Sequence, residues 1–167
     1  MTLQGPDLQV VHEQAMQVNR GDHVDAPRWL EQVLDEFPED VGALNDLGYL
    51  WADGDKHLER ALQMIQVAVS HEPNNMAYRD SLGWVLYRLG RYPEAVAELR
   101  TAAAAEAEPD GVVLDHLAEA LHKSGNAAEA VKTWQRAAET FDKHSEPDKA
   151  KEAREKAAKI ENPSTSN

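Results

Sequence analysis

Small and large apolar residues recur along the chain at a nearly constant interval. A leucine followed by a small residue stands at Leu47-Gly48, Leu82-Gly83 and Leu117-Ala118, and each pair lies 35 residues after the previous one. A second set of alanines and large apolar residues follows each pair and recurs at intervals of 34 and 35 residues. This second set comprises Ala61, Ile65 and Ala68, then Ala95, Leu99 and Ala102, and finally Ala130, Trp134 and Ala137. Two sets that share one period predict an array of repeats, and the spacing within each set predicts helices.

The small residues predict where the two helices of each repeat cross. Helix backbones approach closely only where side chains are small, so we expect Gly48, Gly83 and Ala118 at crossing points within antiparallel helix pairs. The alanines that should face them from the second helix are Ala61, Ala95 and Ala130. The large residues expected to fill the core on either side are Trp51, Leu86, Leu121, Ile65, Leu99 and Trp134.

Glycines and prolines predict where the helices end. Gly90 and Gly125 suit the left-handed conformation that commonly follows a helix. Pro73 and Pro109 should stop the second helices, because proline lacks a backbone donor and disfavours a helical residue before it.

The regions on either side of the three clear repeats differ from them. Residues 7–40 have the expected residues in their second half only, and Glu13-Gln14 occupies the Leu-Gly place, so 7–19 is predicted to be a helix with an altered packing face. Residues 145–160 carry alanines on one stripe and charges elsewhere, which is typical of a capping helix. Residues 161–167 are expected to be a disordered tail of this one continuous domain.

The units at 41–75, 76–110 and 111–144 resemble the tetratricopeptide repeat, whose signature combines Leu-Gly, an aromatic residue, a later alanine and a closing proline. The residues that carry the match in the first unit are Leu44, Leu47, Gly48, Trp51, Ala61, Ile65 and Pro73. The second unit has Arg79 in place of the first apolar residue, and the third lacks the closing proline. The resemblance implies an all-α fold, a right-handed superhelical arc (an α-solenoid) of stacked antiparallel helix pairs, whose first helices line a concave groove. It also implies a protein–protein interaction scaffold that binds a peptide or a partner helix in that groove.

Charge narrows the choice of partner. The 167 residues contain 17 basic and 30 acidic side chains, a formal net charge of −13. Such a balance repels nucleic acid and anionic membrane surfaces, so we expect a protein or peptide partner that is neutral or basic and has an apolar anchor. No signal peptide or membrane-spanning run is visible in these residues, and we expect a cytoplasmic protein, either a monomer or a weak homo-oligomer.

On each first helix, the positions beside the core-facing residues, on the next face around the helix axis, are expected to face the groove. The candidates for partner binding are Asn45, Asp46, Tyr49, Asp80, Ser81, Trp84, Tyr87, Asp115, His116, Glu119 and His122. Two columns repeat every 35 residues: one holds Asn45, Asp80 and Asp115, and the other holds Asp46, Ser81 and His116. Their amide and carboxylate groups suit backbone N–H groups or cationic side chains of a partner, while Tyr49, Trp84 and Tyr87 offer rigid apolar area.

Other interpretations remain open for these residues. Trp84 could bridge neighbouring helices as packing, and the polar columns could be solvated faces or helix caps. The chain could also be a self-associating structural module, or the repeat portion of a larger assembly protein, since similar repeats often form part of longer bacterial chains. The basic pair that the family's chaperone-tail clamp uses to grip a carboxylate is missing, so that ligand is not expected.

The sequence offers no candidate for catalysis. Cysteine is absent, which removes disulfides, thiolate metal sites and cysteine nucleophiles. Neither a Gly-rich phosphate loop, a His-Glu-x-x-His motif nor a Gly-x-Ser-x-Gly motif occurs. We therefore expect no enzyme activity, no cofactor and no metal.

Overall fold

A computed structural model describes residues 26–105 and 108–162. All the secondary structure in these residues is helical. The helices are α2 (Ala26–Glu36), α3 (Val41–Asp53), α4 (Leu58–His71), α5 (Met76–Arg88), α6 (Tyr92–Ala104), α7 (Gly111–Lys123), α8 (Ala127–Lys143) and α9 (Pro147–Glu161).

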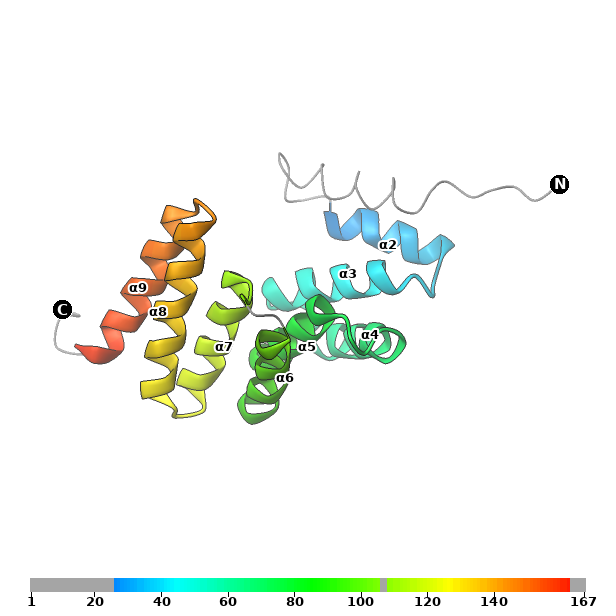
Figure 1. Ribbon diagram of the computed structural model, residues 1–167. Coiled ribbons are helices and arrows are strands. Elements are labelled where there is room, and N and C mark those ends of the chain that lie inside the picture. Colours follow the sequence, from blue (N-terminus) through cyan, green and yellow to red (C-terminus); the bar gives the residue numbers. More distant parts are fainter. Residues whose placement is uncertain (1–25, 106–107, 163–167) are drawn as a thin grey trace.

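The helices pack in chain order and form a curved row from α2 to α9 (Figure 1). Helix α3 packs against α4, α5 against α6, and α7 against α8, which gives three successive antiparallel pairs. The first helices of these pairs also contact one another, since α3 touches α5 and α5 touches α7. This arrangement is the all-α solenoid that the repeat pattern predicts.

The glycines of the Leu-Gly pairs lie where the two helices of a pair cross. A Cβ atom added to Gly48 would lie 2.8 Å from Ile65 Cγ1 and 3.1 Å from the Ala61 carbonyl oxygen. A Cβ atom on Gly83 would lie 2.8 Å from Leu99 Cδ2. The crossing prediction is confirmed for Gly48 and Gly83, because a Cβ atom at either place would lie too close to the second helix.

The large residues predicted for the core are buried. Trp51 and Trp134 have exposed fractions of only 6% and 2%. Ile65, Leu99 and Leu121 are completely inaccessible to solvent. Their burial against neighbouring pairs joins the repeats into one continuous core.

The first helix of each pair begins with the same kind of cap. The side chains of Asp40, Asn75 and Asp110 accept hydrogen bonds from backbone N–H groups of Ala43, of Ala77 and Tyr78, and of Val112 respectively. These three residues are themselves 35 positions apart, a third repeating column that the sequence analysis did not single out. Each cap satisfies donors at a helix start that lack a partner within the helix.

Left-handed residues end four of the helices. Gly90 and Gly125 have φ angles of +76° and +91°, as predicted, and Asp55 and Ser145 adopt φ angles of 56° and 62° at the corresponding places. In each case the next residue donates its N–H back to the last turn of the helix, as Arg91 does to the Leu86 oxygen at 2.9 Å. These turns reverse the chain within a few residues and so keep consecutive helices antiparallel.

The C-terminal cap begins where the Ser145-Glu146-Pro147 sequence predicts, with Pro147 as the first helical residue of α9. Glu161, which was assigned to the tail, is the last residue of this helix. The predicted helix at 7–19 and the rest of the predicted disorder, residues 163–167, lie outside the described residues.

One predicted helix end is wrong. Helix α4 stops at His71, two residues before Pro73, but α6 stops at Ala104, well ahead of Pro109. Proline acts on the residue before it, so Pro109 cannot be what ends α6. Instead Pro109 is buried in the connection to α7, where it helps to line the hollow described below.

Replacing Gly83 with alanine should destabilise the protein. Because the new Cβ atom would overlap Leu99, a fully buried residue, the two helices must separate, and we expect the free energy of unfolding to fall by about 1–3 kcal/mol. Urea unfolding followed by circular dichroism measures this change. The control is Gly54→Ala at the end of α3, where φ is −77° and the Cβ atom would lie 3.3 Å from the Leu50 carbonyl oxygen, so we expect a much smaller loss. Equal stabilities for Gly83→Ala and the wild type would contradict the close crossing.

Candidate functional site

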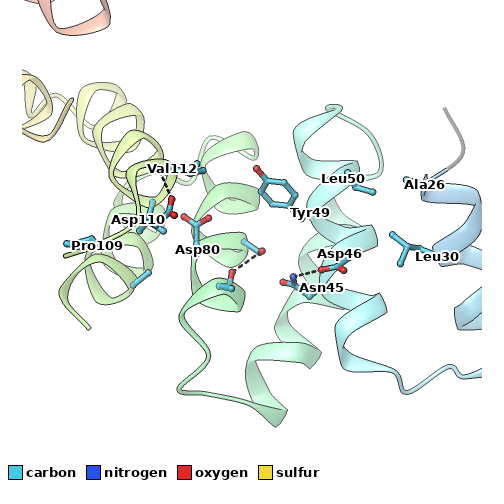
Figure 2. A pocket seen from close by; sticks show the side chains of 14 residues that line it. Ala26, Leu30, Asn45, Asp46, Tyr49, Leu50, Asp80, Pro109, Asp110 and Val112 are labelled. Carbon is cyan, nitrogen blue, oxygen red and sulfur yellow. Dashed lines mark hydrogen bonds between the residues drawn. The ribbon is translucent and has the colours of Figure 1, made fainter. Parts of the chain in front are cut away.

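A hollow of about 480 Å³ opens on the side of the array formed by the first helices. Helices α2, α3, α5 and α7 contribute most of its lining (Figure 2). Ala102 of α6 and the Pro109-Asp110 connection supply the rest. Aliphatic side chains dominate the surface, among them Leu30, Leu50 and Val112. A volume of this size is typical of binding sites rather than of packing defects.

Five of the residues predicted for the groove line this hollow. They are Asn45, Asp46, Tyr49, Asp80 and Ser81 (Figure 2). Asp46, Asp80 and Asp110 supply carboxylates, and no lysine, arginine or histidine is found among the described lining residues. The hollow is therefore apolar over much of its surface and acidic in its polar part.

Asp80 is already engaged within the protein. Its carboxylate oxygens lie 3.0 and 3.1 Å from His116 Nδ1, which joins α5 to α7. Both residues are buried, with exposed fractions of 8% and 5%. The pair thus fixes neighbouring repeats to each other, and His116 lies behind the hollow rather than among its lining residues.

An aromatic stack continues from His116. The Trp84 ring stacks on His116 with centroids 4.2 Å apart and on Tyr87 with centroids 4.9 Å apart. The guanidinium of Arg88 lies 5.7 Å from the Trp84 ring centroid. Trp84 and Tyr87 are half-buried and do not line the hollow, so the bridging role considered for Trp84 describes its contacts well.

The remaining candidates, on α7, contact the capping helix or the core instead. Lys156 of α9 binds Asp115 at 2.8 Å and Glu119 at 3.0 Å, and Glu119 also accepts a hydrogen bond from the Tyr87 hydroxyl at 3.2 Å. Trp134 Nε1 donates to the same Asp115 at 2.8 Å. His122 is exposed, with its ring centroid 6.0 Å from that of Trp134. None of these α7 residues is among those that line the hollow.

Burial and nearby charge shift three pKa values around the site. Burial, with the charges of Asp53 and Asp80, raises the pKa of Tyr49 to about 12. Burial and the charge and hydrogen bond of Glu119 raise the pKa of Tyr87 to about 12. Burial alone lowers the pKa of Lys156, but hydrogen bonds and charges from Asp115 and Glu119 outweigh it and raise that pKa. At neutral pH both tyrosines are therefore neutral hydrogen-bond donors, and Lys156 is a cation.

Several residues of the site escaped the sequence analysis. Ala26 and Leu30 come from the region 7–40, which matches the repeat only in its second half, and Pro109 comes from a connection. None of the three belongs to the columns of the first helices. Lys156 lies on α9, which is outside the three repeats, so the 35-residue period does not predict its position. A signal existed for Asp110, since it continues the 35-residue column of capping residues at Asp40 and Asn75.

Two further properties concern only the residues that the structure describes. Within 26–105 and 108–162, no three acidic, histidine or cysteine side chains converge in a way that would hold a metal ion. No helix in that part of the chain is long and apolar enough to span a bilayer.

Comparison with known families identifies the family to which this fold belongs. The sequence model of the tetratricopeptide repeat matches residues 54–112 and 81–146, which together cover more than half of the chain. The chain belongs to the tetratricopeptide repeat family. Its members build extended binding surfaces from stacked helix pairs, so this chain is a repeat scaffold of the protein-interaction type.

Known relatives agree with this family. A TPR repeat-containing protein of Pseudomonas aeruginosa is 33% identical over 114 residues, which represent 68% of this chain but only 19% of that protein. This tetratricopeptide chain thus spans about a fifth of the relative's length.

Solved structures resemble the fold over nearly its full length. A thermophilic TPR protein of Thermus thermophilus superposes with a TM-score of 0.68 at 17% identity, covering 95% of this chain and 93% of that one. MamA of Desulfovibrio magneticus RS-1 superposes with a TM-score of 0.61 at 19% identity, covering 97% and 99%. At these identities the likeness concerns the fold alone.

Replacing Lys156 with methionine should loosen the capping helix. The variant keeps the apolar stem but leaves Asp115 and Glu119 without their cation, so we expect the free energy of unfolding to fall by about 1 kcal/mol at neutral pH. Since folding raises the Lys156 pKa above 10.5, this contribution is complete below pH 10.5 and disappears as the pH rises beyond it. Urea unfolding at pH 7 and above pH 11 measures both effects.

The control for this experiment is Lys151→Met on the same helix. Lys151 is largely exposed and lies 3.9 Å from Glu155, so its removal should leave stability almost unchanged. An equal loss in the two variants would mean that Lys156 contributes only surface charge.

Proposed function

We propose that this tetratricopeptide chain binds a segment of a partner protein, a peptide or a helix, in the hollow formed by its first helices, and that it performs no catalysis of its own. The hollow itself is the observation that supports this most. Its volume of about 480 Å³ is framed by rigid helices, which hold the lining residues in place before a ligand arrives.

The lining indicates the kind of partner. Leu30, Leu50 and Val112 suit an apolar side chain as an anchor. The carboxylates of Asp46 and Asp110 disfavour an acidic segment and favour a neutral or basic one, in line with the net charge of −13. The residues proposed to contact the partner are therefore Asn45, Asp46, Tyr49, Asp80 and Ser81. His116 holds Asp80 from behind, and Trp84 stacks on His116.

Filling the hollow provides a test that does not disturb the core. Ala77 is exposed, lies in the first turn of α5 and lines the hollow, so Ala77→Trp should obstruct binding while the fold remains intact. We expect at least about a tenfold loss of partner recovered by affinity capture from the cell that makes the protein, with an unchanged circular dichroism spectrum.

The matched control is Ala97→Trp. Ala97 is an exposed alanine on α6 that does not line the hollow, and its replacement should leave capture unchanged. Full capture by Ala77→Trp would contradict binding in the hollow. Light scattering over a concentration series separates the self-association alternative, which requires the mass to grow with concentration.

A further inference from the structure

Equivalent residues on the first helices bind the next helix of the stack in two of three cases. Asn45, Asp80 and Asp115 occupy the same position in α3, α5 and α7, 35 residues apart. Asp80 binds His116 of α7 at 3.0 Å, and Asp115 binds Lys156 of α9 at 2.8 Å. In both cases a carboxylate on one helix accepts a hydrogen bond from a side-chain nitrogen two helices further along the chain.

Asn45 does not complete this pattern. Its counterpart on the next helix is Ser81, which takes the place in α5 that His116 takes in α7, but the short Ser81 hydroxyl donates instead to the Ala77 carbonyl at 3.1 Å. Asn45 Nδ2 donates to Asp46 Oδ1 at 3.1 Å, whereas its Oδ1 atom is buried and has no hydrogen-bond partner in the described part of the chain. Because a carboxylate can only accept, Asp46 also fixes which end of the amide is left unpaired.

An unpaired buried acceptor is costly and uncommon in folded proteins. Asn45 has an exposed fraction of only 6%, yet its side chain lines the hollow (Figure 2). The atom is therefore shielded from bulk water, but the side chain that carries it borders the hollow, so a donor of another molecule reaches Oδ1 once the amide turns toward the hollow.

We infer that Asn45 Oδ1 accepts a hydrogen bond from a backbone N–H group of the partner segment, and that this segment carries a lysine or arginine beside an apolar residue. The inference rests on the proposed function of the hollow. The donor takes the role that His116 and Lys156 play for the equivalent residues. The apolar residue packs on Leu30, Leu50 and Val112, and the cation lies near Asp46 and the exposed Asp110. A carboxylate in the same place is repelled by the carboxylates of Asp46, Asp80 and Asp110, which line the hollow.

Defined peptides test the chemistry directly. The probes are labelled nine-residue peptides with blocked ends and a central leucine or phenylalanine, flanked on both sides by lysine, glutamine or glutamate. Fluorescence polarisation with the full chain should give dissociation constants at least about tenfold lower for lysine-flanked than for glutamate-flanked peptides. N-methylation, scanned one residue at a time along the lysine-flanked peptide, should weaken binding about tenfold at the position that donates to Asn45.

Asn45→Leu separates this inference from the proposed function. Leucine has nearly the same size and removes the unpaired acceptor, so the free protein should melt at the same or a higher temperature while the lysine-flanked peptide binds about tenfold more weakly. The N-methyl scan should then become flat. The control is Thr133→Val on α8, which removes a buried hydroxyl that donates to the Glu129 carbonyl at 2.9 Å, and which should not change binding.

The outcomes distinguish what fails. Asn45→Leu could bind the peptides like the wild type while Ala77→Trp does not. The hollow then binds a partner without a hydrogen bond to Asn45, so the inference is overturned but the proposed function is not. If no peptide binds the wild type, or if glutamate-flanked peptides bind best, the inference is overturned, and the first result counts against the proposed function as well. If Asn45→Leu instead abolishes concentration-dependent self-association, the occupant is a second copy and the cationic partner is wrong.

Discussion

The close approach of two helix backbones within each pair is the constraint on which the rest of the structure depends. Gly48 and Gly83 leave no room for a side chain, because a Cβ atom on either would lie 2.8 Å from a buried side chain of the second helix. With the pairs held this closely, the large residues on both sides must interlock with neighbouring pairs, and every first helix turns the same face toward the hollow. The position of the hollow is thus a consequence of where the small residues stand.

The ends of the first helices keep that face in register. Asp40, Asn75 and Asp110 cap the starts, and left-handed residues at Asp55, Gly90 and Gly125 terminate the ends. Both sets recur every 35 residues, so three helices of equal length begin and stop at equivalent places. The second helices have no such side-chain caps and depend more on packing for their stability.

The helices, their pairing and the core could be predicted because each depends on local spacing within a 35-residue unit. The composition of the hollow could be predicted only in part. Five lining residues could be predicted from the face of the helix that carries each of them, and the structure brings them together. They are Asn45, Asp46 and Tyr49 of α3 and Asp80 and Ser81 of α5. The engagement of Asp80 with His116 and of Asp115 with Lys156 could not be read from the period, because it depends on side-chain length across repeats and, for Lys156, on a helix outside the array. Pro109 shows the same limit, since a proline signals a break in a helix but not how far away the helix has already ended.

Asp80 and Asp115 share a repeating column with Asn45 and join helices of the array, and this affects how any variant of that column must be interpreted. Asp80 and Asp115 each hold two helical elements together, so their removal leaves a buried or half-buried cationic or donor group without its partner, and a loss of binding would follow from a loss of structure. Asn45 is different, because its Oδ1 atom has no hydrogen-bond partner in the described chain, and its removal takes away that cost together with only one hydrogen bond, to the neighbouring Asp46. Ala77 is different as well, because it is exposed and its side chain ends at Cβ. The proposed binding can therefore be tested separately from folding in the part of the hollow between α3 and α5, where Asn45 makes no hydrogen bond to the next repeat within the described residues.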